Sequence, residues 1–298
     1  MTNPGAQRLV FVGNRAFVWH EARRAGLPLV ESLAIAGTYF DRQADQLGVP
    51  VRRIGSKRDL LDTLAALDFD LLLCNGVPHI LPISRIARPG QRFINVHPGP
   101  LPDLRGADPV NGAILLDRPA GAAVHVMDDG IDTGPLIARR RFPVPQGADV
   151  RLLYQMVFEA ERQVFRQALA RNFEPDPALA EPVSADSVYY TIRTADRRLQ
   201  PTDNAALTVR KVRAFATPNQ APAFRIADTN LRAQAAAIVN GAALDQMSAG
   251  LDTNQVVTSG PDFLVLTKPD GLVLLDRVSG DLGAIGRGST LKQSDLND

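Results

Sequence analysis

Short apolar runs alternate with amphipathic stretches through the first two thirds of the chain, and this alternation restricts the fold more than any other feature. The apolar runs cover residues 9–12, 33–35, 49–54, 70–74, 92–96, 122–127 and 135–142. Helical patterns cover residues 17–24, 41–47, 56–67, 108–116 and 150–169. Strands that alternate with helices form parallel, doubly wound sheets with helices on both faces. We therefore predict an α/β fold with a doubly wound, mostly parallel, Rossmann-like sheet.

The pattern changes after a proline-rich segment at residues 173–182. From residue 222 onward, short β-like runs are separated by turns, at residues 223–226, 235–239, 255–257, 263–266 and 271–274. A helix is expected at residues 205–214, and the polar tail from about Gly286 is expected to fray. The sequence thus predicts a Rossmann-like domain at residues 1–180, a linking segment at 181–222 and a small β-rich C-terminal domain at 223–298.

Balanced charge and the lack of a long apolar run limit the possible partners. The chain has 33 Lys and Arg against 32 Asp and Glu, for a net charge of +1, whereas nucleic-acid-binding domains carry a basic surplus or stripe. No apolar run reaches the roughly 18 residues that a membrane helix needs, and the N-terminus is too polar for a signal peptide. The single cysteine, Cys74, suits a reducing cytoplasm, and no Cys or His cluster has metal-ligand spacing. We expect a cytoplasmic protein with no membrane span and no metal site, and nucleic acid is a disfavoured partner.

An Asn and a His stand two positions apart at the end of one predicted strand, in the segment FINVHPGPLPDLRG at residues 93–106. Side chains two apart on a strand project from the same face, so Asn95 and His97 can address one group of atoms. An amide can donate a hydrogen bond to a developing oxyanion, and an imidazole can hold a proton near neutral pH. A carboxylate that could orient the imidazole is Asp132, in the glycine-flanked loop MDDGIDTG. We expect His20, inside a predicted helix, to be a satisfied surface or core residue, and His125, inside a predicted strand, to serve packing.

Three motifs together resemble those of the folate-dependent formyltransferase family: NVHP at residues 95–98, LPDLRG at 101–106 and GIDTGP at 130–135. The resemblance implies transfer of a formyl group from N10-formyltetrahydrofolate to an amine. It implies that Asn95, His97 and Asp132 are catalytic. It also implies that two segments bind the folate, with the residues His79, Ile80, Leu81, Pro82, Met127, Asp128, Asp129, Gly130 and Ile131.

The identity of the acceptor amine is less determined by the sequence. Candidate acceptor contacts are Asn14, Gly99, Pro100 and Arg105, of which the Gly99-Pro100 pair departs from the usual family pattern. The segment around Tyr189 and Arg193 is similar to that of enzymes that formylate nucleotide-linked amino-deoxy sugars, so such a sugar is the favoured acceptor. The alternatives are methionyl-tRNA, a small amine such as a hydroxylated ornithine, or water in a formyltetrahydrofolate hydrolase. The oligomeric state is open, with a homodimer as one alternative.

Overall fold

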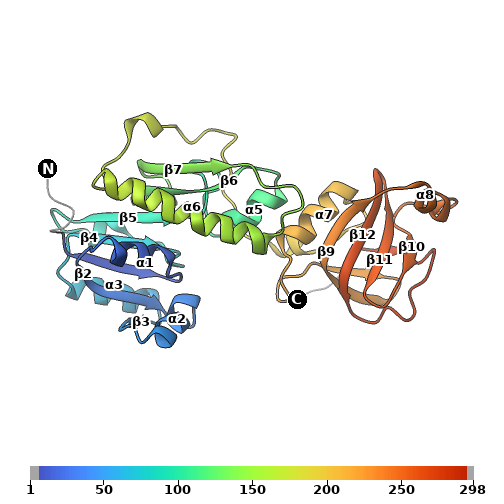
Figure 1. Cartoon of the computed structure of the whole chain (residues 1–298), viewed down its shortest axis with the longest axis horizontal. Coiled ribbons are helices and arrows are strands. Elements are labelled where there is room, and N and C mark those ends of the chain that lie inside the picture. Colours follow the sequence, from blue (N-terminus) through green and yellow to red (C-terminus); the bar gives the residue numbers. More distant parts are fainter. Residues whose placement is uncertain (1–6, 294–298) are drawn as a thin grey trace. The chain divides into compact units, whose positions relative to one another are not determined.

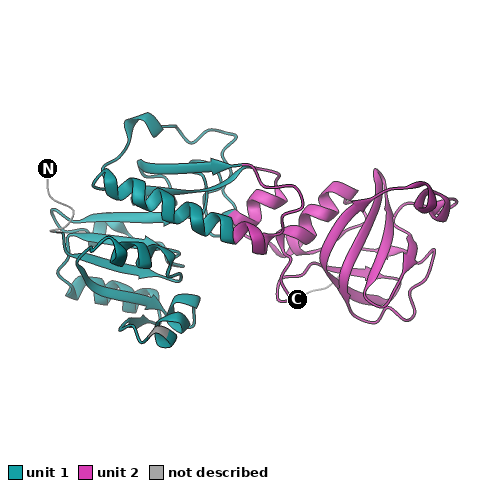
Figure 2. Ribbon diagram, viewed as in Figure 1, with its two compact units in different colours: residues 1–109, 119–142, 155–190 teal, residues 110–118, 143–154, 191–298 magenta. Residues whose placement is uncertain are grey.

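The computed structural model describes residues 7–293, which fall into two compact units (Figure 2). The first unit comprises residues up to 109 together with 119–142 and 155–190, and the second comprises 110–118, 143–154 and the chain from 191 onward. The first unit is built on a seven-stranded sheet in the order β3-β2-β1-β4-β5-β6-β7 (Figure 1). Its strands are β1 (Leu9–Gly13), β2 (Leu29–Ile35), β3 (Arg52–Ile54), β4 (Leu71–Asn75), β5 (Arg92–His97), β6 (Ala120–Val126) and β7 (Leu136–Phe142).

The first five strands of this sheet are parallel, β6 pairs antiparallel with β5, and β7 pairs antiparallel with β6. The first unit holds the helices α1 (Phe17–Arg24), α2 (Tyr39–Leu47), α3 (Lys57–Ala66), α4 (Ile83–Ile86) and most of α6 (Val150–Ala170). Helix α5 (Pro109–Leu115) falls almost entirely in the second unit. The predicted doubly wound, mostly parallel sheet is confirmed. The short helix α4 is not in the prediction, and β3 is shorter than the predicted strand at residues 49–54.

Two hydrophobic cores lie on opposite faces of the sheet, because alternate residues of a strand point to opposite sides. In β1, Leu9 and Phe11 belong to the core that includes side chains of α1 and α6. Val10 and Val12 belong to the core that includes Leu60 of α3. Helix α3 begins where the sequence predicts, since the Ser56 side chain accepts a hydrogen bond from the backbone of Asp59 (3.1 Å). The layered arrangement gathers the carboxyl ends of β1, β4 and β5 at one edge of the sheet.

The second unit contains a six-stranded antiparallel sheet in the order β10-β11-β12-β9-β8-β13. Its elements are α7 (Ala205–Ala214), β8 (Ala223–Ile226), β9 (Thr229–Val239), α8 (Ala242–Ser248), β10 (Val256–Ser259), β11 (Phe263–Lys268), β12 (Gly271–Ser279) and β13 (Leu291–Lys292). The predicted β-rich C-terminal region is confirmed. The expectation that the tail frays from Gly286 is wrong for residues 286–293, because β13 in this segment pairs with β8. Residues 294–298 lie outside the described part of the chain.

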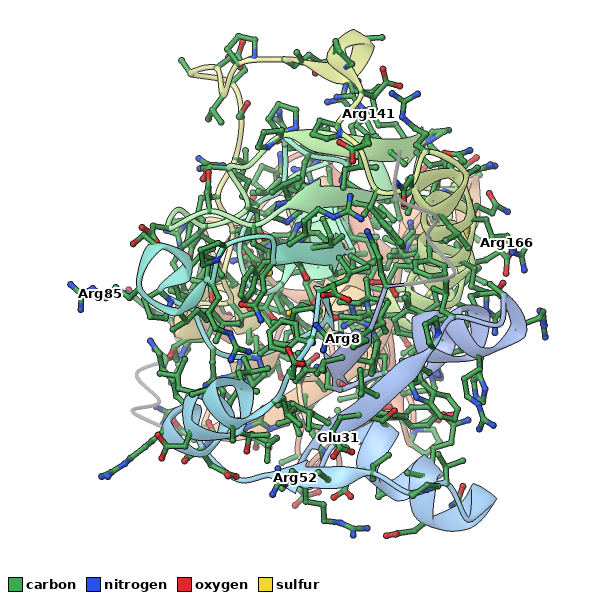
Figure 3. All side chains as sticks on the ribbon, turned by 90° about the vertical axis from the view of Figure 1, so that its left-hand side faces the viewer. Arg8, Glu31, Arg52, Arg85, Arg141 and Arg166 are labelled. Carbon is green, nitrogen blue, oxygen red and sulfur yellow. The ribbon has the colours of Figure 1, made fainter. Side chains whose placement is uncertain are left out.

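Charged side chains such as Arg52, Arg85 and Arg166 are exposed and extend outward from the first unit (Figure 3). Within residues 7–293, no helix combines the length and the apolar character that a membrane crossing requires.

Candidate active site

A cavity of about 380 Å³ opens at the edge of the sheet where the parallel strands end. Asn14 follows β1, Gly76 follows β4, and Asn95 and His97 lie at the end of β5, and all four line this cavity. Other parts of the wall come from the loops around Ile80 and Asp132, from Gly106 and from Tyr189. Ligands of doubly wound proteins bind outside the carboxyl ends of the strands, so the cavity lies where the fold favours a site.

The structure brings together the three residues predicted to be catalytic. The Asp132 carboxylate lies between the other two, with Oδ1 3.4 Å from Asn95 Nδ2 and Oδ2 3.6 Å from His97 Nδ1. The backbone N–H of Gly106 donates a hydrogen bond to Asp132 Oδ2 (2.9 Å). Asp132 has a left-handed backbone (φ 55°), a conformation that Asp tolerates better than most residues. The geometry suits a carboxylate that orients an imidazole.

His97 is almost fully buried, with 4% of its surface exposed. Burial lowers the pKa of His97, and the Asp132 carboxylate and the Leu104 carbonyl oppose this effect. The Leu104 oxygen lies 2.9 Å from His97 Nε2, and because a carbonyl only accepts hydrogen bonds, Nε2 carries the proton. A neutral imidazole in this position can take up a proton during a reaction. Although burial by itself would raise the pKa of Asp132, positive charge on the His97 and His125 imidazoles and the hydrogen bond from the Gly106 amide lower that pKa well below its ordinary value. The carboxylate therefore stays charged when a neighbouring imidazole takes up a proton.

His125 belongs to the same cluster, so the expectation that it serves only packing is wrong. It lies in β6 directly opposite Asn95 of β5, and it lines the cavity. Its Nδ1 is 2.9 Å from the Val126 oxygen, so Nδ1 carries the hydrogen and Nε2 accepts from Asn95 Nδ2 (3.2 Å). His125 Nε2 is also 3.5 Å from Asp132 Oδ1. The sequence could have revealed this contact only through the antiparallel pairing of β5 with β6.

Most residues of the two predicted folate-binding segments line the cavity. Those that do are His79, Ile80, Leu81, Met127, Asp128, Gly130 and Ile131. Pro82 is instead the N-cap of α4, and the Asp129 carboxylate accepts a hydrogen bond from the backbone of Ser84 (3.0 Å). These two residues therefore shape the loops rather than line the cavity. The Asp128 carboxylate accepts from the Gly130 N–H (3.0 Å) and from the Thr133 hydroxyl (2.8 Å), which fixes the turn.

Only one of the four residues predicted to contact the acceptor lines the cavity. Asn14 lines the cavity, whereas Gly99, Pro100 and Arg105 do not. Gly99 packs against the His97 imidazole, because a Cβ at this position would lie 2.7 Å from His97 Nε2. The backbone of Arg105 accepts a hydrogen bond from the Tyr190 N–H (2.8 Å). This pairing places Tyr189, which is 47% exposed, on the cavity wall.

Arg15, Cys74 and Pro98 also line the cavity. Arg15 lies beside Asn14, and its guanidinium is paired with Glu161 of α6 (2.6 Å). Cys74 is buried in β4, and burial raises the pKa of its thiol to about 12, so the side chain is a neutral thiol. Pro98 follows His97 directly. Within residues 7–293, no group of three or more His, Cys, Asp and Glu side chains has the geometry of a metal site.

The sequence profile of a family described as formyl transferase matches residues 9–169. These residues include every element that lines the cavity except Tyr189. The chain belongs to the formyl transferase family. Its relatives include the methionyl-tRNA formyltransferase of Acidithiobacillus ferrooxidans, which is 30% identical over 239 residues, or 76% of this chain and 74% of the relative. The enzyme of the same name from Novosphingobium aromaticivorans is 32% identical over 199 residues, which cover 66% of this chain and 65% of that one.

For several of these formyl transferase relatives the match spans just under two thirds of their length. Solved structures of the family share the fold over more of the chain. The N-formyltransferase of Helicobacter canadensis, solved with folinic acid and dTDP-3-aminofucose, has a TM-score of 0.67 at 14% identity and covers 91% of this chain and 99% of that one. WlaRD, a sugar 3N-formyl transferase solved with dTDP and 5-N-formyl-THF, has a TM-score of 0.69 at 14% identity, with 91% and 97% covered.

Proposed function

We propose that this protein is an N-formyltransferase that moves a formyl group from N10-formyltetrahydrofolate to the amine of a small acceptor. The observation that carries the proposal is the contact of Asn95, His97 and Asp132 in one cavity, in a chain of the formyl transferase family. These residues supply an amide donor, a neutral base and a fixed carboxylate. Formyl transfer to an amine needs all three, because charge develops on the formyl oxygen while a proton leaves the amine.

The reaction begins when the neutral amine of the acceptor attacks the formyl carbon. A C–N bond forms, and the carbonyl electron pair moves to the oxygen. Asn95 stabilises this oxyanion, because its two contacts from Nδ2 are long (3.2 and 3.4 Å) and one N–H can turn toward the oxygen. A preorganised donor of this kind contributes about 3–4 kcal/mol.

The attacking nitrogen then loses a proton to His97 Nδ1, the ring nitrogen left free because Nε2–H donates to the Leu104 oxygen. The Asp132 carboxylate, 3.6 Å from Nδ1, stabilises the positive charge of the imidazolium. When the tetrahedral intermediate collapses, the bond between the formyl carbon and N10 breaks and N10 takes up the proton. The products are the formamide and tetrahydrofolate. Seven residues of the segments at 79–82 and 127–131 line the cavity, and in our proposal the folate lies against them. A flat, partly apolar ring suits a wall that contains Ile80, Leu81 and Ile131.

For the acceptor, we propose the amine of a nucleotide-linked amino-deoxy sugar. The support is the likeness in fold, over 91% of this chain, to an N-formyltransferase solved with dTDP-3-aminofucose and to a sugar 3N-formyl transferase solved with dTDP. Methionyl-tRNA is the second candidate, and the sequence relatives that carry this name favour it. The net charge of +1 argues against tRNA, because binding a polyanion calls for a basic surplus.

The test is an acceptor panel of amino-deoxy sugars linked to dTDP, UDP and GDP, together with hydroxyornithine and charged initiator tRNA. We expect tetrahydrofolate release that depends on one of the sugar nucleotides. Formate release without any acceptor would indicate a hydrolase instead. Turnover with the tRNA alone would reassign the acceptor, and no turnover with any of them would refute formyl transfer. The variant His97→Ala, checked for folding, is the control for reaction in this cavity.

A further inference from the structure

A second polar cluster lies beside the cavity and has no part in the mechanism described above. At its centre is Glu161 of α6, which is fully buried at 0% exposure. Glu161 Oε1 accepts hydrogen bonds from Arg15 (2.6 Å) and from Asn75 Nδ2 (3.0 Å). Arg15 follows β1 and Asn75 ends β4, so the carboxylate connects a helix with two strand ends of the sheet.

Asn75 connects this cluster with the catalytic residues. Its Nδ2 also donates to the backbone oxygen of Val96 (3.1 Å), and Val96 stands between Asn95 and His97. Arg15 lines the cavity, and its guanidinium lies 5.5 Å from the centre of the Phe158 ring. The cluster therefore touches the strand end that carries two catalytic side chains, and also the wall of the site.

The cluster is not built for stability alone. A buried ion pair often contributes less to stability than apolar side chains of similar volume would. Glu161 Oε2 and the Asn75 oxygen are buried and have no hydrogen-bond partner within residues 7–293, which adds to the cost of burial. A costly polar group next to a reaction centre is more readily explained by function than by stability.

We infer that Glu161 is a positioning residue for the transfer reaction, which fixes the strand end of Asn95 and His97 through Asn75 and holds Arg15 at the cavity wall. The expected effect of Glu161 on kcat rests on the proposed function, whereas its expected effect on the His97 pKa does not. The charged and titratable groups that act on His97 are Asp132, His125 and Glu161, and Glu161 itself faces Arg15. The charge of Glu161 opposes the lowering of the His97 pKa by burial.

Glu21 offers a matched control for Glu161. It is also a buried carboxylate, with 5% exposure, and it pairs with an arginine of α6, Arg166, at 2.8 Å. Neither Glu21 nor Arg166 lines the cavity. The variants Glu161→Gln and Glu21→Gln each remove one negative charge from an Arg–Glu pair that has one member on α6. Only the first pair is linked, through Asn75, to the strand of Asn95 and His97.

The experiment compares both variants with the unchanged full-length protein in two measurements. The first is the titration of the His97 imidazole by NMR, which is tractable because the chain has four histidines and His97→Ala assigns the signal. We expect the His97 midpoint to move to lower pH in Glu161→Gln and to stay in place in Glu21→Gln. The second is steady-state kinetics with the best acceptor of the panel. We expect kcat of Glu161→Gln to fall about 10- to 100-fold, with both KM values unchanged.

An unchanged His97 titration in folded Glu161→Gln would overturn the inference, whether or not any acceptor is found. A fall in kcat that Glu21→Gln reproduces would also overturn it, because the effect would then be general destabilisation. If Glu161→Gln does not fold, the kinetics of Asn75→Leu test the inference instead. This variant removes the hydrogen bond to the Val96 oxygen and leaves the Arg15–Glu161 pair in place. A lower kcat for folded Asn75→Leu supports the inference, and an unchanged kcat overturns it. Absence of turnover in the unchanged protein would refute the proposed function alone.

Discussion

Replacing Asp132 by Asn separates the charge of this side chain from its shape. The backbone of Asp132 is left-handed, and Asn adopts this conformation almost as readily as Asp does. The new amide oxygen can still accept from the Gly106 N–H, as Oδ2 now does at 2.9 Å. The other end becomes an NH₂ group that faces Asn95 Nδ2, the donor that now lies 3.4 Å from Oδ1. The substitution therefore preserves the hydrogen bond from Gly106, but it leaves two NH₂ groups, that of the introduced Asn side chain and that of Asn95, facing each other.

The expected loss of activity is large compared with the loss of stability. His97 would lose the carboxylate that orients it, at 3.6 Å from Nδ1, and that raises its pKa against the effect of burial. General acid–base catalysis typically contributes about 10²- to 10⁴-fold, and we expect kcat to fall within this range. Hydrogen bonds to charged groups contribute about 1.5–3 kcal/mol, so the free energy of unfolding at pH 7 should fall by roughly this amount.

The pH dependence of stability gives an independent check on the charge of Asp132. Because the pKa of the folded-state carboxyl lies well below its ordinary value, its stabilisation is fully present above the unfolded carboxyl pKa of about 3.9. The stabilisation is lost as the pH falls through the folded pKa. The Asp132→Asn variant should lack this contribution, so the difference in unfolding free energy between the two proteins should shrink in acid.

The assay follows tetrahydrofolate release at saturating acceptor, with urea unfolding measured on the same samples. Asp132→Ala serves for comparison, because it also removes the charge but adds the strain of a left-handed alanine, about 1–2 kcal/mol. Both variants should lose similar activity, and the alanine variant should be the less stable one. The role given to Asp132 would be refuted if folded Asp132→Asn kept more than about one tenth of the original kcat.

Three further outcomes can be measured on this chain. His125→Leu should reduce kcat about 10-fold or more while both KM values change little, because Asn95 loses the acceptor at 3.2 Å that orients its amide. An unchanged kcat in a His125→Leu protein that urea unfolding shows to be folded would contradict this role. Lys268 is buried and burial lowers its pKa to about 8, so the free energy of unfolding should rise between about pH 8 and 10.4 by about 3 kcal/mol. This rise should be absent from Lys268→Met. Gly134→Ala should destabilise the fold by about 1–3 kcal/mol in thermal unfolding, because its Cβ would lie 1.9 Å from the Val126 oxygen.

The sign for Lys268 follows from proton binding. In that pH range the unfolded chain holds a proton that the folded chain has released, so raising the pH removes the cost of burying the charge. Only the difference between Lys268→Met and the unchanged protein tests this, because other groups titrate in the same range. The effect is confined to the second unit, where Lys268 donates to the Gln200 oxygen (3.1 Å) and to Asn254 (2.8 Å).

Local periodicity was sufficient to predict the parallel part of the sheet. Buried strands such as β4 are continuous apolar runs, and α3 has a capping serine and an apolar stripe, so each pattern is contained within a few neighbouring residues. The motifs also identified Asn95, His97 and Asp132, which the fold brings into one cavity. Asn95 and His97 are two apart on one strand, so local geometry already places them on one face.

Contacts between distant segments were decided only by the tertiary structure. The sequence of β6 does not show that it runs antiparallel to β5, and this pairing is what places His125 opposite Asn95. The burial of Glu161 against Asn75 depends on how α6 packs on the sheet, 86 residues along the chain. A strand or helix pattern records which face of an element is apolar. The pattern does not show which polar side chain of another element will contact that element, because such contacts depend on the strand order and on the placement of the helices.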